Sequence, residues 1–171
     1  MKTVAVVVGA ALMGALPAAI AAPKDQSKQD QAFVDEAARG GKIEVDLGRL
    51  AEQNASDANV KQFGARMVKD HTKLNSELGT VAKSIGLTVP TALSAEQQTE
   101  YAKLSKLSGT KFDKVYMDLM VKDHTGDLAA FQNEEAATQN PKLKRAVANA
   151  IPIIQEHLNM AKSDSTKLAA G

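Results

Sequence analysis

Residues 60–85 read VKQFGARMVKDHTKLNSELGTVAKSI and place an apolar side chain at every third or fourth position. That spacing follows the turn of an α-helix and predicts a long amphipathic helix. We expect this helix to have Ser56 as its N-cap and to end at Gly86. Asp70 and His71 fill a gap in the apolar stripe. The face that should be buried therefore carries two polar side chains at its middle.

Three other segments show the same helical periodicity, and they span about 31–54, 110–138 and 141–168. Asn140-Pro141 is a typical helix start, with an N-cap followed by proline at the first helical position. In the first of these segments Glu44 lies on the apolar line rather than on the solvent face. No strand pattern appears in the sequence, so the fold class should be all-α.

The lengths of the connections predict how the helices are arranged. Short links after the first and third long helices favour two antiparallel hairpins. The link over 86–109 is long enough to cross the whole bundle, and Ser94 followed by Gln97 predicts a short helix within it, over about 95–107. Two hairpins joined by one long crossover between the second and third helices describe a ferritin-like four-helix bundle.

The N-terminus has the pattern of a targeting segment. Lys2 precedes an apolar run, and Ala19-Ile20-Ala21 resembles a cleavage site, so residues 1–21 are predicted to be a signal peptide. Residues 22–30 should form a flexible leader, and residues 31–170 the bundle domain. We therefore expect an exported, periplasmic protein with no membrane span in its mature part.

The amino-acid composition excludes some kinds of binding partner and some kinds of metal site. The 21 basic and 20 acidic residues nearly balance, and no basic block appears, which argues against nucleic acid as a partner. The chain has no cysteine, so disulfides and thiolate metal sites are excluded. No feature of the sequence indicates a protein partner or an oligomeric state.

All three histidines directly follow a carboxylate, in the pairs Asp70-His71, Asp123-His124 and Glu156-His157. Imidazole is the commonest metal ligand in proteins. The three histidines and Glu44 lie near the middle of the four predicted long helices, so a bundle would bring them to one level. We therefore predict a metal site in the core, with Glu44, His71, His124 and His157 as ligands. Further ligands or supporting partners in this prediction are Asp70, Asp123 and Glu156.

The donor set suits iron, manganese, zinc or copper and does not choose among them. Di-iron enzymes of ferritin-like fold place a glutamate three residues before histidine, whereas here the carboxylate directly precedes it. A mononuclear site therefore fits better, although His124 and Asp127 form an i, i+3 pair in the reverse order. The alternative is a metal-free polar network in a structural, stress-associated or partner-binding bundle. The residues leave open whether the protein is an enzyme.

Several motifs occur together in an order that resembles a known family. They are the run from Phe33 to Ala51, the two Met-Val-Lys-Asp-His segments, the segment from Ser108 to Tyr116, and the segment from Pro152 to Leu158. This combination resembles domain of unknown function 4142, a bacterial exported family, over about residues 30–168. The resemblance implies a ferritin-like four-helix fold and export, and it implies no settled activity.

Overall fold

The computed structural model describes residues 23–170, which form helices and contain no strand. The all-α prediction is confirmed. The described residues form five helices, four long ones and the short helix that the sequence predicts within the long connection. They are α1 (Pro23–Asn54), α2 (Ala58–Ser84), α3 (Ala95–Leu104), α4 (Gly109–Ala137) and α5 (Pro141–Ala170). The predicted signal peptide over 1–21 lies outside the described residues.

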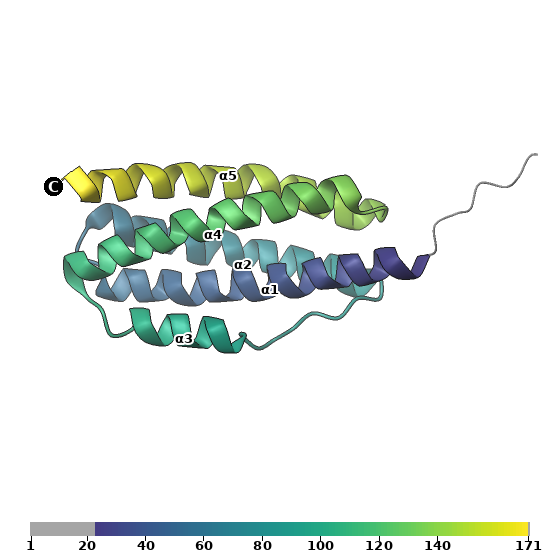
Figure 1. The fold of residues 1–171 in the computed structure, drawn as a ribbon, viewed down its shortest axis with the longest axis horizontal. Helices are drawn as coiled ribbons and strands as arrows, with labels where there is room; N and C mark the ends of the chain where they lie inside the picture. Colours follow the sequence, from purple (N-terminus) through teal and green to yellow (C-terminus); the bar gives the residue numbers. More distant parts are fainter. Residues whose placement is uncertain (1–22, 171) are drawn as a thin grey trace, which may run out of the picture.

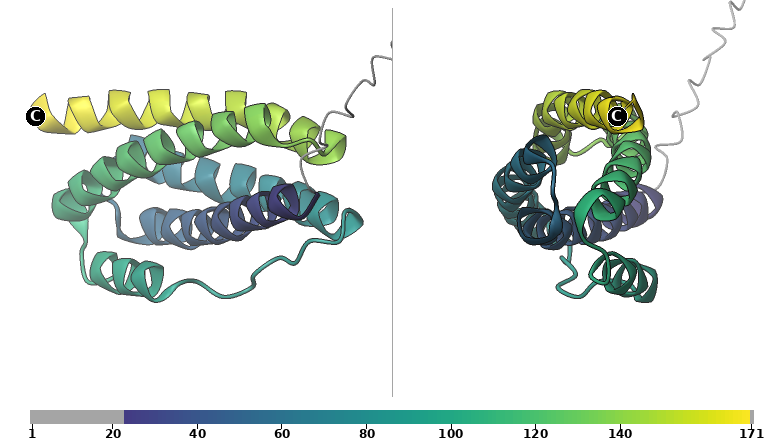
Figure 2. Two further views of the ribbon diagram at one scale, coloured as in Figure 1. Left: turned by 45° about the vertical axis from the view of Figure 1, so that its right-hand side comes forward. Right: turned by 90° about the vertical axis from the view of Figure 1, so that its left-hand side faces the viewer.

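The four long helices lie side by side as two hairpins (Figures 1 and 2). Helix α1 packs mainly on α2 and α4 mainly on α5, while contacts of α2 with α5 and of α1 with α4 join the two hairpins. The link between α2 and α4 runs along the outside, and its short helix α3 contacts α1 and α4. None of the described helices is long and apolar enough to cross a membrane.

Two of the three N-caps predicted from the sequence are present in the structure. Asn140 accepts from the first turn of α5, and Ser94 and Gln97 form the expected capping box of α3. The expected cap of α2 was wrong, because Asp57 rather than Ser56 accepts from the first turn of that helix. Ser56 instead donates its backbone N–H to Asp113 on α4, at 3.0 Å. A contact from a distant helix thus displaces the cap by one residue.

Helix α1 also begins earlier than expected, at Pro23 instead of about Gln31. Residues 23–30, which we predicted to be a flexible leader, continue the helix. The physical reason is a contact with α4: Asp30 is buried, and Gln29 on the same turn reaches Glu134 at 3.5 Å. The added turns of α1 are thus held by a neighbouring helix rather than left in solvent.

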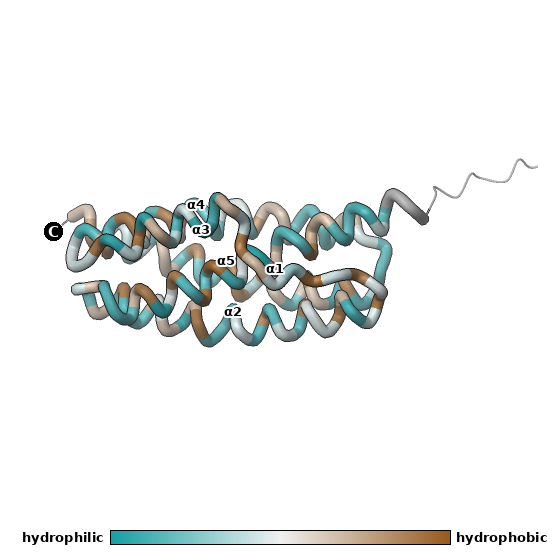
Figure 3. The backbone as a smooth tube through the Cα atoms, turned by 90° about the horizontal axis from the view of Figure 1, so that it is seen from below, coloured by the Kyte–Doolittle hydropathy of each residue, from teal (hydrophilic) through white to brown (hydrophobic). Residues whose placement is uncertain are grey.

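The core consists of two apolar clusters with a polar layer between them. One cluster includes Leu47, Phe63 and Met120, and the other includes Phe33 and Leu78. Figure 3 shows apolar and polar residues alternating along the helices, as amphipathic helices require. Buried polar side chains separate the two clusters at mid-height: Glu44, His71, His124 and His157.

Two glycines allow α1 and α2 to touch through their backbones. A Cβ atom at Gly48 would lie 2.7 Å from the carbonyl oxygen of Gly64, and one at Gly64 would lie 2.7 Å from the carbonyl oxygen of Gly48. Larger residues would push the helices apart. Because Gly48 is one turn beyond Glu44, this contact fixes how α1 presents Glu44 to α2.

Candidate metal centre

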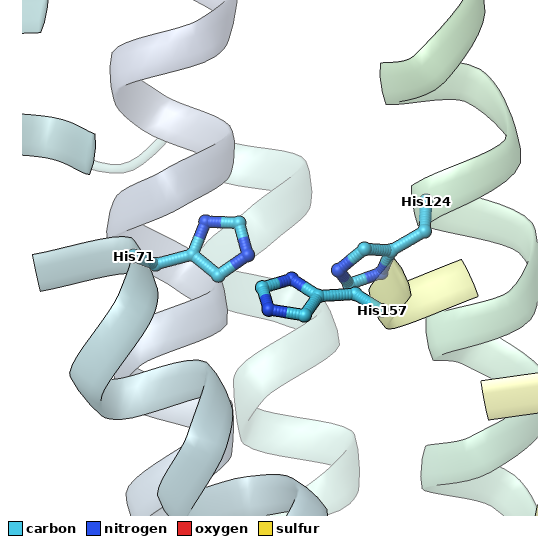
Figure 4. Close-up of side chains that lie close together, drawn as sticks. All are labelled: His71, His124 and His157. Carbon is cyan, nitrogen blue, oxygen red and sulfur yellow. The ribbon is translucent and has the colours of Figure 1, made fainter. Parts of the chain in front are cut away.

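Three helices bring the three histidines together in the core, as Figure 4 shows. His71 lies on α2, His124 on α4 and His157 on α5, and all three side chains are buried. Their ring centres form a nearly equilateral triangle with sides of 5.2, 5.4 and 5.6 Å. One ring nitrogen from each lies within 4.8 Å of the other two, so the three residues could hold one metal ion.

Each ring uses one nitrogen to contact an oxygen outside the triangle. The pairs are His71 Nδ1 with Glu44 Oε2 at 2.8 Å, His124 Nδ1 with the Met120 carbonyl at 3.0 Å, and His157 Nε2 with Asp70 Oδ2 at 3.0 Å. The contacts of His124 and His157 are hydrogen bonds, and that of His71 with Glu44 is a close ion-pair contact. Oxygen acceptors of this kind fix the tautomer of metal-binding histidines.

The second nitrogen of each ring is buried, and no described residue hydrogen-bonds to it. These atoms are His71 Nε2, His124 Nε2 and His157 Nδ1. Buried polar atoms are nearly always paired, so three unpaired nitrogens in one place require an explanation. A neutral imidazole that donates from one nitrogen carries a lone pair on the other. The core therefore presents three lone pairs to a common point.

Glu44 brings a carboxylate to the same point. Its Oε1 lies 3.4 Å from His124 Nε2, and neither of its oxygens has a well-formed hydrogen bond within the described chain. Because the Met120 carbonyl can only accept, His124 in its neutral form has a lone pair facing this oxygen. Two electron-rich atoms at this distance repel unless a cation or a proton lies between them.

Electrostatics keep the carboxylate charged and two of the rings neutral. Burial acts to raise the pKa of Glu44, but the neighbouring histidines outweigh it and lower this pKa to about 2. Burial lowers the pKa of His157 to about 4 and also lowers the pKa of His124. For His71, burial acts to lower the pKa, yet the charge of Glu44 raises it overall. At neutral pH two of the rings are therefore already in the form that binds metals.

The other predicted residues lie farther out. Asp70 bridges His157 and Arg66, whose Nε lies 2.5 Å from Asp70 Oδ2. Glu156 is an exposed side chain that also accepts from Arg66, at 3.0 Å. Asp123 is half-buried, and the group of described residues that could hold an ion consists of the three histidines, without Asp123, Glu156 or Glu44. Of the three carboxylates that precede a histidine, only Asp70 contacts the triangle.

Two residues near the site were not in the predicted ligand set. Asp127 on α4 lies close to Glu44, and its pKa is raised by burial and by the charge of Glu44. The i, i+3 spacing from His124 was the sequence signal for it. Arg66 lies one turn before Asp70 on α2, and this i, i+4 spacing favours the ion pair between them. No pattern in the sequence predicts the contact of Arg66 with Glu156 on α5.

A family model described as "Domain of unknown function (DUF4142)" matches residues 15–163. No curated protein sequence matches the chain. Among solved structures, "CopM in the Cu(II)-bound form" has a TM-score of 0.68 at 16% identity, covering 81% of this chain and 96% of that chain.

Two more solved structures show the same likeness. "CopM in the Cu(I)-bound form" has a TM-score of 0.65 at 15% identity, and it covers 78% of this chain and 93% of that chain. "CopM in the Ag-bound form (by co-crystallization)" has a TM-score of 0.63 at 18% identity, with the same coverage. At these identities the likeness shows a shared fold and nothing finer.

Proposed function

The chain belongs to the DUF4142 family, and we propose that it binds one transition-metal ion in its core. His71, His124 and His157 would be the ligands, with Glu44 as the fourth. The observation that carries this proposal is the meeting of three buried imidazole nitrogens that have no partner in the described chain. A bound ion would pair all three and would also neutralise the buried charge of Glu44.

The donor set limits the choice of metal. Three imidazoles and one carboxylate suit zinc, copper, iron and manganese, and such sites generally bind Cu(II) most tightly. The related folds were solved with Cu(II), Cu(I) and Ag bound. Copper is therefore the first ion to test, with silver, zinc, iron and manganese after it.

The surrounding residues support this role. Asp70 and the Met120 carbonyl each hold one outer ring nitrogen, so that His157 and His124 turn their other nitrogens inward. Partners of this kind commonly change metal affinity by about 10- to 100-fold. We leave Asp123 and Glu156 out of the proposed ligand set because neither contacts a histidine ring in the described structure.

We also make a proposal about the arrangement of the helices and about where in the cell the protein is located. We infer that the four long helices form a ferritin-like frame over residues 31–170, with the segment carrying α3 as its crossover. We also propose that residues 1–21 direct export to the periplasm. N-terminal sequencing of the exported protein should find Ala22 as the first residue, and retention of Met1 would contradict this.

Elemental analysis of untagged protein, exported from the full-length chain, tests the metal site. We expect close to one copper ion per chain after reconstitution, and none in the His71→Ala/His157→Ala double variant. Asp123→Asn is the matched control, since it alters a carboxylate beside His124 that contacts no ring, and it should retain the metal. Equal metal content in the parent and the double variant would overturn the proposal.

The second candidate is a metal-free structural bundle, and the close contact of His71 with Glu44 favours it. A protonated His71 would neutralise Glu44 without any metal. The two functions differ in their response to chelation. A metal protein should melt at a lower temperature after chelation and recover with copper. A structural network should show neither effect.

A further inference from the structure

A small cavity lies beside the histidine triangle. Its volume is about 30 Å³, enough for roughly two water molecules. The polar end is lined by Glu44, His71, Asn75 and Asp127, and the exposed residue Glu77 also lines the cavity. The remaining wall is largely apolar and includes Leu74, Leu78, Phe131 and Val147. Two of the four proposed ligands thus face this space, whereas neither His124 nor His157 lines it.

A glycine keeps the polar end open. A Cβ atom at Gly41 would lie 2.0 Å from the side-chain oxygen of Asn75. Any larger residue there would drive the Asn75 amide out of its place beside the cavity. Helix α1 therefore leaves room for a polar side chain on α2 at the level of Glu44.

A surface groove lies next to the cavity. A shallow groove between α2 and α5 is lined by Glu77, Val81, Lys142, Arg145 and Ala146, among others. Glu77 and Ala146 also line the inner cavity, so this pair lies between the groove and the cavity. Glu77 is exposed and Ala146 is half-buried. The Ala146 methyl group and the Glu77 side chain are therefore the groups that a solute would have to pass to go from the groove into the cavity.

We propose that a small anionic ligand of two or three heavy atoms passes between Glu77 and Ala146 and binds the metal from the side of Glu44 and His71. The inference rests on the proposed metal site. The size follows from the cavity volume, which excludes larger solutes. The charge follows from both ends of this route: Lys142 and Arg145 outnumber Glu77 in the groove, and a divalent ion in the core would outweigh the single negative charge of Glu44 beside the cavity.

Azide is a suitable probe, because a bound azide gives Cu(II) a charge-transfer absorption band that free azide lacks. Copper-loaded parent protein should show this band with saturation as azide is added. In Ala146→Leu the longer side chain should block the junction between groove and cavity, and we expect azide affinity to fall at least tenfold. Ala146→Val adds a smaller side chain and serves if the leucine variant folds poorly. Its loss of azide affinity should be smaller than that of Ala146→Leu.

Ala148→Leu is the matched control. It adds the same atoms to the same helix at a half-buried position that does not line the cavity, and it should bind azide like the parent. Copper content is measured first in every sample. Absence of copper in the parent would overturn the metal site and this inference with it. Bound copper without an azide band, or equal azide affinity in Ala146→Leu, would overturn the inference alone.

Discussion

The Nε2 atom of His124 lies 3.4 Å from Oε1 of Glu44 in a core where neither atom has a hydrogen-bond partner in the described chain. The ring is held by its other nitrogen, which contacts the Met120 carbonyl at 3.0 Å. This pair of atoms is therefore fixed at a distance that favours a cation between them. Glu44 is the residue on which the metal-bound and metal-free interpretations differ most.

Glu44→Gln keeps the size of the side chain and removes its charge. If Glu44 is a ligand, Cu(II) affinity should fall at least tenfold, equivalent to about 1.4 kcal/mol, because an amide is a weaker ligand than a carboxylate. Competition titration against a chelator of known affinity measures this change. Glu52→Gln on the same helix is the control and should leave the affinity as it is. Unchanged affinity in Glu44→Gln would remove Glu44 from the ligand set.

Copper binding should release a proton from His71. Burial acts to lower the pKa of this ring, but the charge of Glu44 raises it overall, so a share of the metal-free molecules carries a proton there near pH 6.5. A metal ligand must lose that proton. Calorimetry in buffers with different ionisation enthalpies should detect release at pH 6.5 that fades as the pH rises. The same binding enthalpy in all buffers at pH 6.5 would contradict it.

The contact between α1 and α2 predicts opposite effects for two glycines of the same helix. At Gly64 an added Cβ would lie 2.7 Å from both Gly48 and Ala51, so Gly64→Ala should destabilise the fold by about 1–3 kcal/mol. At Gly79 no atom lies within 4 Å, so Gly79→Ala should stabilise it by about 0.5–1 kcal/mol. Urea denaturation measures both, and equal effects would show that the helices adjust freely.

The carboxyl group of Glu134 should make stability fall with rising pH. Burial and the nearby Asp30 raise the pKa of Glu134 from 4.5 to about 7. The folded state thus holds a proton that the unfolded state loses, and its contribution, full below pH 4.5, is lost as the pH rises through 7.

Glu134→Gln removes this charge without changing the shape of the side chain. At pH 8 the variant should melt about 2–4 °C higher than the parent, whereas at pH 4.5 the two should melt alike. Thermal melts at the two pH values make the comparison. A lower melting temperature at pH 8 would show that the ionised carboxylate is needed there. Glu135→Gln, which alters the adjacent residue of α4, is the control.

Sequence reasoning found the layer of polar residues because each member interrupts an apolar stripe at mid-helix. It failed where one helix alters another. Ser56 lost its role as a cap because Asp113 on α4 accepts its backbone N–H. The two Met-Val-Lys-Asp-His segments predict equal roles for Asp70 and Asp123, yet only Asp70 contacts a histidine ring. That difference depends on which helix packs next to each aspartate, and the sequence of a single segment cannot predict it.

The contact of Asp70 with His157 predicts that Asp70 orients the His157 ring, and this effect can be distinguished from the effect of its negative charge. Asp70→Asn should weaken Cu(II) binding by about 10- to 100-fold, because an amide no longer fixes the ring so that Nδ1 faces the site.

Glu156→Gln is the matched control, since Glu156 shares Arg66 with Asp70 but contacts no ring in the described structure. It should change copper affinity by less than about twofold, as expected for an exposed ion pair. Chelator competition together with the Cu(II) electron paramagnetic resonance spectrum would test this role. A loss of affinity with an altered spectrum in Asp70→Asn supports positioning, whereas equal losses in both variants would mean that only the surface charge matters.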